Sequence, residues 1–391
     1  MFLNDKPELR EQLYRCSKCG YCRDTISDEL GFYHVCPVYD VLRMEHFCGR
    51  GRATIALGLM EGAVQFSEPL ANMVHTDLGC GACKEICPEN IDIPAITRAL
   101  RKEIVKSKLE SLKLKQIYSV LEETHNIFGE EKPRSSWAED LGLPKKGETL
   151  YFAGCSASYT YPKTARAIVK ILSEAGVKVA YLGEDEWCCG APALWGGYIE
   201  FFEKIAKLNL SAIKASGAKT VIFGCAVCYN SLKTHYQSMI GKLPFKPLHI
   251  SEVIYDLMQK GDVHFQPIRR RFTYHDPCHL GRDEKVYEQP REVIKKIPEA
   301  EFYEMPRNRK SAFCCGEGVV VSTLFPNLTR KISANRISEA KETGADAIVT
   351  CCPGCVATLS KAAAWLKSRG KTEIEVYDLP IIVAESMRLK L

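Results

Sequence analysis

The stretches WCCGAP at residues 187–192 and FCCGEG at 313–318 decide the architecture of this chain. Each places two adjacent cysteines before a glycine, and each lies within a set of five cysteines. The spacing is C-x32-CC-x35-C-x2-C in the first set and C-x35-CC-x36-C-x2-C in the second. Corresponding cysteines lie 123, 126 or 127 residues apart, so we interpret the region as a duplicated unit. The first set is Cys155, Cys188, Cys189, Cys225 and Cys228, and the second set is Cys278, Cys314, Cys315, Cys352 and Cys355.

Short apolar segments alternate with helical patterns around both sets of cysteines. This alternation predicts an α/β fold with parallel sheets. Cys155, Cys225, Cys278 and Cys352 each follow a predicted strand, at the edge where open α/β sheets bind ligands. Buried structural cysteines would explain one or two such positions, but not ten that repeat. The expected strands are 149–153, 178–182, 219–223, 271–275, 301–305 and 346–350, and the clearest helical patterns are 162–176 and 198–217.

A different cysteine pattern occupies the first hundred residues. Three cysteines follow the spacing C-x2-C-x2-C, and two further cysteines each precede a proline. Ferredoxins that hold two iron–sulfur clusters have this arrangement, in which the cysteine before proline binds the other cluster. The predicted ligands are Cys16, Cys19, Cys22 and Cys87 for one cluster, and Cys36, Cys80 and Cys83 for the second.

The second cluster lacks its expected fourth cysteine. The residue three positions before Cys80 is Asp77, and the nearby Cys48 is the eighth cysteine of this region. Thiolate is the usual ligand of these clusters, so we expect Cys48 to complete the set. An oxygen ligand from Asp77 and a three-iron cluster are the two alternatives. Zinc is disfavoured, because it prefers four tetrahedral ligands from two short cysteine or histidine pairs.

Composition and charge limit the class of protein. The 391 residues include 19 cysteines, 46% hydrophobic residues and 26% charged residues, which is typical of a globular chain. We find neither an apolar signal segment at the start nor a run with the length of a membrane helix, so we expect a cytoplasmic protein without structural disulfides. A net charge of +5 is too small to indicate nucleic-acid binding. No P-loop or strand-associated G-x-G-x-x-G occurs, so we expect no flavin or nucleotide in this chain.

We expect the chain to divide into four segments. A mostly helical, two-[4Fe-4S] ferredoxin-like domain is expected at 1–110, a helical linker at 111–147, and the two repeated domains at 148–262 and 263–391. Residues 49–64 have a helical pattern, and one long basic helix is expected after Pro94. Its basic face would either be solvated or dock an acidic partner.

The complete pattern resembles the catalytic subunits of heterodisulfide reductases. The CCG domain of that family has the cysteine spacing found here, and a ferredoxin domain fused to two CCG domains resembles its D subunit. Related iron–sulfur subunits accompany glycolate oxidase, anaerobic glycerol-3-phosphate dehydrogenase and the benzoyl-CoA reductase complex. The resemblance covers nearly the whole chain.

The resemblance implies four [4Fe-4S] clusters, two cubane and two non-cubane. Each complete CCG motif in this family holds one non-cubane cluster, so each set of five cysteines is the expected ligand set, and Cys351 is left over. The segment HDPCH at 275–279 is similar to a segment that the family shares. His279 would donate a proton to a leaving thiolate or tune the cluster potential, and Cys278 and Cys188 are the other candidate catalytic residues.

Two functions are consistent with this resemblance. The first is an oxidoreductase subunit of an anaerobic complex that passes electrons through cubane clusters to two non-cubane clusters, which reduce a disulfide. The alternative is an electron-relay subunit without a disulfide substrate, linking a flavoprotein to an acyl-CoA reductase of the benzoyl-CoA type, a hydroxy-acid oxidase or a quinone-linked cytochrome. The expected partners are an HdrA-like flavoprotein or a membrane cytochrome b subunit, which would dock the chain at the inner membrane face, or a tungsten or molybdenum reductase module. His249 and Glu252, which have no counterpart in the second copy, hint at a function of the first copy.

Overall fold

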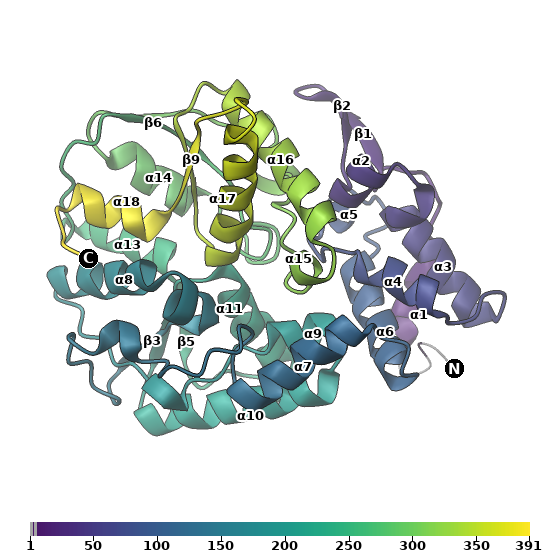
Figure 1. Cartoon of the computed structure of the whole chain (residues 1–391), viewed down its shortest axis with the longest axis horizontal. Helices are drawn as coiled ribbons and strands as arrows, with labels where there is room; N and C mark the ends of the chain where they lie inside the picture. The colour runs from purple at the N-terminus through teal and green to yellow at the C-terminus, as the bar shows by residue number, and fades with distance from the viewer. Residues whose placement is uncertain (1–2, 4–5) are drawn as a thin grey trace.

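The computed structural model describes residue 3 and residues 6–391, which form an N-terminal helical region and two α/β units (Figure 1). A hairpin of two short strands fills the insertion between Cys22 and Cys36. The rest of this region is helical, as predicted. Its elements are α1 (Pro7–Arg15), β1 (Asp24–Ser27), β2 (Gly31–His34), α2 (Pro37–Leu42), α3 (Gly49–Glu61), α4 (Glu68–His75), α5 (Ala82–Glu85) and α6 (Ile93–Lys106).

The expected long helix after Pro94 is two helices. Helix α6 ends at Lys106, and α7 (Leu112–Thr124) begins after a turn in which Lys108 has a left-handed backbone, with φ of 58°. The side chain of Ser111 then caps α7 by accepting a hydrogen bond from the Leu114 amide at 3.3 Å. The prediction of one helix was wrong, because the helical spacing of apolar residues in this segment gives no sign of the turn.

The first α/β unit has a three-stranded parallel sheet in the order β3-β4-β5. The segment expected as a strand at 178–182 pairs with β3 only at Ala180, because the next amide, that of Tyr181, donates to the Pro144 carbonyl instead. The unit comprises β3 (Thr149–Phe152), α8 (Pro162–Glu174), α9 (Ala191–Gly196), α10 (Ile199–Ser216), β4 (Thr220–Phe223), α11 (Ala226–Asn230), α12 (Gln237–Ile240), β5 (Lys246–His249) and α13 (Ile250–Lys260).

The second α/β unit has a four-stranded parallel sheet in the order β7-β6-β8-β9. Its outer strand β9, like β5 in the first unit, was not predicted, since each carries too few apolar residues to stand out. The α/β class with parallel sheets is confirmed. The unit comprises β6 (Arg270–Tyr274), α14 (Glu288–Lys296), β7 (Ala300–Phe302), α15 (Val321–Leu324), α16 (Pro326–Glu342), β8 (Ala347–Thr350), α17 (Pro353–Lys367), β9 (Glu375–Asp378) and α18 (Leu379–Ser386).

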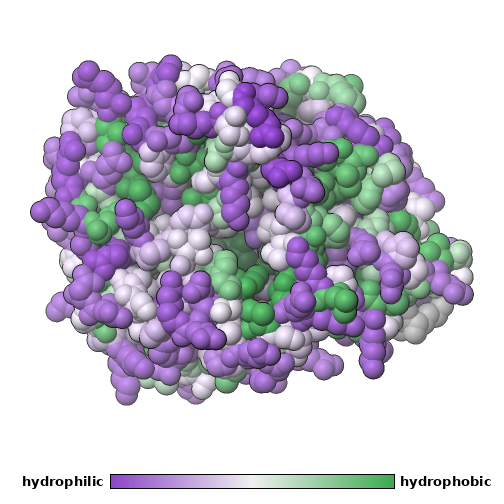
Figure 2. All heavy atoms as spheres, viewed as in Figure 1, coloured by the Kyte–Doolittle hydropathy of each residue, from purple (hydrophilic) through white to green (hydrophobic). Residues whose placement is uncertain are grey.

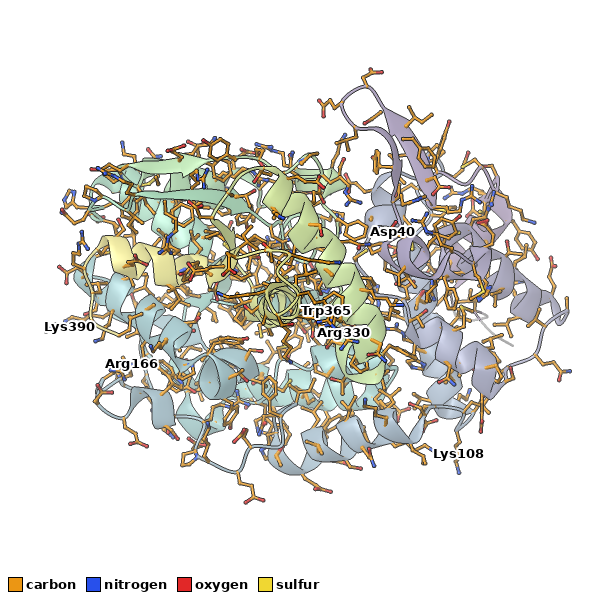
Figure 3. All side chains as sticks on the ribbon, turned by 45° about the horizontal axis from the view of Figure 1, so that its top comes forward. Asp40, Lys108, Arg166, Arg330, Trp365 and Lys390 are labelled. Carbon is orange, nitrogen blue, oxygen red and sulfur yellow. The ribbon has the colours of Figure 1, made fainter. Side chains whose placement is uncertain are left out.

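The N-terminal region contacts both α/β units. The buried Arg101 of α6 donates to the Trp195 carbonyl at 2.7 Å, and the Arg98 guanidinium lies 4.8 Å from the Trp195 ring centroid. On the other unit, Asn335 of α16 donates to Asp40 at 2.6 Å (Figure 3). Arg98 and Arg101 are basic residues of the helix expected after Pro94. They belong to an internal interface, and not to the solvated or docking face that was expected for that helix.

The tight contact of Gly79 with Trp195 is testable. Gly79 has a φ of +63°, and a Cβ there would lie 2.4 Å from the Trp195 ring, whereas Gly176 has a φ of +73° and open space. Alanine would strain either backbone by about 1 kcal/mol, but only at Gly79 would overpacking add about 1–3 kcal/mol. We expect Gly79→Ala to lower the thermal unfolding midpoint clearly more than Gly176→Ala in calorimetry of the full chain. Equal shifts would contradict the interface.

Candidate iron–sulfur sites

All 19 cysteines are free thiols, and apart from Cys351 they gather in four groups. Two groups lie in the N-terminal region, and we call them the outer and inner ferredoxin sites. The other two are the first and second cysteine sets defined by the repeat.

The outer ferredoxin site is a small cavity near the start of α3. Cys19 is exposed, and the backbone amide of Arg50 donates to the Cys22 sulfur at 3.0 Å. A Cβ at Gly49 would lie 3.0 Å from that of Cys22 and 3.1 Å from that of Cys83, so a glycine lets α3 start between the two ferredoxin sites. The cysteines that line the cavity are Cys16, Cys19, Cys22, Cys83 and Cys87, which include the four predicted ligands.

The inner ferredoxin site is a second small cavity, lined by Cys36, Cys80 and Cys83 as predicted. Asp77 and Arg52 complete its polar lining, and Cys48 is not among the residues around it. Cys48 is instead buried beside Cys22, and its thiol donates to the Glu45 carbonyl at 3.0 Å.

The first cysteine set forms a chain of contacting thiols at the carboxyl ends of β3 and β4. Contacts join Cys155 to Cys188, Cys189 to Cys228, and Cys228 to Cys225. The Cys228 sulfur lies close to the backbone of Gly154. A Cβ at Gly154, where φ is +73°, would be only 2.8 Å from that sulfur. The structure thus brings together residues that the sequence pattern placed at strand ends.

A buried ion pair supports the first cysteine set. Arg134, from the segment after α7, donates to the Cys155 sulfur at 3.6 Å and to Glu186 at 3.2 Å. Glu186 also accepts hydrogen bonds from the Ala153 and Gly154 amides, at 2.9 and 2.8 Å. Burial outweighs these partners and raises the pKa of Glu186 to about 7. Neither Arg134 nor Glu186 was predicted, because neither residue belongs to a spacing pattern such as the one that the cysteines form.

The second cysteine set is enclosed more tightly than the first set. The sulfurs of Cys315 and Cys355 lie 3.3 Å apart, and the small cavity between the thiols has a volume of about 20 Å3. The imidazole of His275 approaches Cys315 and Cys355, with ligand atoms of all three within 4.8 Å of one another. Cys351 instead contacts the buried hydroxyl of Tyr274, which fits a core thiol.

His279 lies on the small cavity of the second set. Its Nδ1 donates to Asp283 at 2.7 Å, and its ring lies 5.7 Å from the Trp195 ring between centroids. Burial alone would lower its pKa, but the charges of Cys278 and Asp283 and the hydrogen bond raise it to about 10. His279 therefore places a positive charge beside the second set.

Two contacts between thiols and one shared cysteine connect the four sites in a line. The inner ferredoxin site touches the second set through the thiols of Cys80 and Cys314. The second set touches the first through Cys225 and Cys352, which are equivalent positions of the repeat. Because Cys83 lines both ferredoxin cavities, the line extends to the exposed outer site.

A cavity of about 750 Å3 lies against the first cysteine set, between the two α/β units. Figure 2 shows a hollow near the middle of the face, in the region where Figure 1 places α11, α15 and α17. Arg330, Lys361 and Trp365 line it from the second unit, and Arg330 lies beside Trp365, 5.5 Å from the ring centroid (Figure 3). The cysteines in its wall are Cys155, Cys188, Cys189, Cys225 and Cys228.

Glu317 lines both the large cavity and the small cavity of the second set. It accepts a hydrogen bond from the Val319 amide at 2.5 Å, and burial raises its pKa to about 7. Glu317 was not predicted as a site residue. The available signal was the difference between FCCGEG and WCCGAP, in which glutamate replaces an alanine directly after the glycine.

His249 and Glu252 have a structural explanation. The His249 side chain accepts from the Ser251 amide, while Glu252 accepts from the His249 amide at 2.9 Å, so together they cap the start of α13. Their presence in only the first copy therefore does not indicate a separate chemical function.

Comparison with known proteins finds one ferredoxin-type domain and two cysteine-rich domains in the chain. Residues 149–233 and 272–360 each match the CCG cysteine-rich domain, and residues 12–91 match a 4Fe-4S dicluster domain. The D subunit of the dihydromethanophenazine:CoB–CoM heterodisulfide reductase of Methanosarcina barkeri is 32% identical over 391 residues, covering 97% of this chain and 95% of the relative. The chain belongs to the family of heterodisulfide reductase D subunits. It is an iron–sulfur oxidoreductase subunit of this or a related type.

More distant relatives match over part of their length or in fold alone. The EtfAB:quinone oxidoreductase of Syntrophomonas wolfei is 28% identical over 330 residues, covering 79% of this chain and 46% of that protein. The crystal structure of a hypothetical protein from Helicobacter pylori has a TM-score of 0.60 at 14% identity, covering 87% of this chain and 68% of that one. No helix among the described residues is both long and apolar enough to span a membrane.

Neighbouring Cys351 and Cys352 provide a matched test of the ligand assignment. Cys352 touches Cys225 and Cys355, whereas Cys351 faces Tyr274. We expect Cys352→Ala to lower the iron content by about four atoms per chain, because one cluster would lose a ligand, and Cys351→Ala to retain all of it. Iron and acid-labile sulfide assays on anaerobically purified protein measure this. Equal iron loss in both variants would contradict the assignment.

Proposed function

We propose that this subunit carries electrons from the outer ferredoxin site, through the inner site and the second cysteine set, to the first set, where a disulfide is reduced. The observation that carries the proposal is the large cavity, whose wall contains all five cysteines of the first set. The contacts at Cys80 with Cys314 and at Cys225 with Cys352 support the order of the sites.

We propose four [4Fe-4S] clusters, one in each site. The donor chemistry fits, because thiolates are the preferred ligands and each site gathers at least three of them. The buried side chain of Arg282 also supports a cluster in this region. Its Nη2 is buried and has no hydrogen-bond partner among the described residues, close to Cys80, Cys278 and Cys314, so it could donate to cluster sulfur. When bound, the clusters would supply single electrons and an iron that accepts a substrate sulfur.

The residues around the clusters have electrostatic and positioning roles in this proposal. Arg134 and Arg282 place buried guanidinium groups beside sulfur ligands of the first and second sets. His279 adds a further positive charge to the second set, so we assign it the tuning role and not proton donation, since it does not line the large cavity. Cys188 lies in the wall of that cavity, while Cys278 lies on the small one.

The lining of the large cavity indicates the chemistry of the substrate. Lys113, Arg330 and Lys361 line it, together with the Trp365 ring. A disulfide with anionic groups would satisfy these cations, while its apolar part would pack against the indole. This arrangement favours a small anionic disulfide over a neutral acceptor.

The second candidate is an electron relay without a disulfide substrate. The exposed Cys19 of the outer site and the similarity to a quinone oxidoreductase favour it, because both suit exchange of electrons with a flavoprotein or membrane partner. The two functions are separated by anaerobic EPR of protein with about sixteen irons per chain, recorded with and without thiols or disulfides. A thiol-dependent paramagnetic signal supports disulfide reduction, and the same iron content without any response supports the relay.

Filling the large cavity tests its role directly. Ala357 lines the cavity from α17, whereas Ala364 on the same helix is exposed and outside it. We expect Ala357→Trp to lower anaerobic disulfide reductase activity by at least about ten-fold, because the indole would displace the substrate from the first set, and Ala364→Trp to leave it unchanged. Iron content and reduction of the clusters by dithionite serve as controls. Wild-type activity in Ala357→Trp would contradict the proposed substrate site.

A further inference from the structure

The inner ferredoxin site contains three cysteines and one carboxylate. Cys36, Cys80 and Cys83 line its cavity, and Asp77 lines it with them. Asp77 is three residues before Cys80, where the two-cluster pattern has a cysteine. The structure therefore places an oxygen donor beside the three sulfurs.

Cys48, the other candidate for the fourth ligand, is turned toward different groups. It is fully buried next to Cys22 of the outer site. Its thiol donates to the Glu45 carbonyl at 3.0 Å and to the Glu45 carboxylate at 3.1 Å. Reaching the inner cavity would break these contacts and move the first turn of α3, which starts directly after Cys48.

The Asp77 carboxylate is held by two hydrogen bonds and one ion pair. The Gly79 amide donates to Oδ1 at 2.7 Å, while the Thr97 hydroxyl and Arg52 Nε reach Oδ2 at 3.0 and 3.2 Å. A carboxylate offers about four lone-pair sites, so one remains unused on Oδ1. Arg52 cannot move away easily, because its other nitrogens donate to the Met73 carbonyl and the Thr76 hydroxyl.

We infer that Asp77 is the fourth ligand of the cluster in the inner ferredoxin site, binding iron through Oδ1. The inference rests on the proposed presence of a [4Fe-4S] cluster in that site. Carboxylate is a weaker partner for cluster iron than thiolate. An iron held by Asp77 would therefore be lost more easily than one held by a thiolate.

The chemical consequence is a reversible loss of one iron. With a cluster bound, Asp77 would be the ligand that releases iron: a one-electron oxidant would take up one electron, the bond from iron to the Asp77 oxygen would break, and Fe2+ would leave a three-iron cluster on Cys36, Cys80 and Cys83. One electron and one Fe2+ would restore the four-iron form. Because the inner site lies between the outer site and Cys314, this exchange would interrupt electron flow through the chain under oxidising conditions.

The test uses the full chain, purified without oxygen, as wild type and as Asp77→Cys, Asp77→Asn and Cys48→Ser. Each protein is treated with ferricyanide, and the EPR signal of the three-iron cluster and the released Fe2+ are quantified. We expect the wild type and Cys48→Ser to form the signal and to lose it when Fe2+ and dithionite are added. Asp77→Cys should form at least five-fold less signal, because thiolate retains the fourth iron. Asp77→Asn, which keeps the side-chain shape without the anionic oxygen, should hold the three-iron cluster before any oxidant is added.

Two results would overturn the assignment. A wild type that forms no three-iron signal lacks the labile iron. A signal that is unchanged in Asp77→Cys but altered in Cys48→Ser assigns the ligand to Cys48. Iron and sulfide contents of the untreated proteins distinguish a wrong ligand assignment from a wrong proposed function. If the ferredoxin clusters are absent, every variant will lack about eight irons.

Discussion

The buried guanidinium of Arg282 joins the N-terminal region to the second α/β unit, and the line of cysteine sites depends on it. It donates to the Cys80 carbonyl at 2.6 Å and to the Ala312 carbonyl at 2.7 Å, two residues before Cys314. One side chain therefore fixes the two segments whose cysteines meet between the ferredoxin region and the repeat. A hydrogen bond to a charged group contributes about 1.5–3 kcal/mol, more than the roughly 0–1 kcal/mol of a surface ion pair.

The two cysteine sets differ in how open their surroundings are. The repeat makes the sets alike in sequence, yet the first set opens on a cavity of about 750 Å3 and the second encloses about 20 Å3. The second set also has Arg282 and the cationic His279 beside its sulfurs, and it touches the ferredoxin region. These differences suit an internal carrier of electrons at the second set and exchange with a bound molecule at the first.

Cysteine spacing predicted most of the fold and the grouping of the cysteines. Strand ends placed Cys155, Cys225, Cys278 and Cys352 correctly, because parallel strands bring their carboxyl ends to one edge. Cysteine spacing could not predict how the two α/β units pack against each other. The contact of Cys225 with Cys352 arises from packing between residues distant in sequence. Arg282 and Glu317 were missed for the same reason, since burial and not a motif makes them important. The place of Cys48 depends on a 3.0 Å bond to Glu45 that no sequence pattern encodes.

Contacts between thiols join the inner ferredoxin site, the second set and the first set, and Cys83 extends this line to the outer site. Multifrequency EPR of the fully reduced protein tests this most directly, because magnetic coupling between clusters falls steeply with distance. The contact between Cys225 and Cys352 predicts signals split by coupling between the first and second sets, with a splitting in field units that does not change with microwave frequency. Spectra that are simple sums of isolated, uncoupled clusters would show that the first and second sets do not lie in contact.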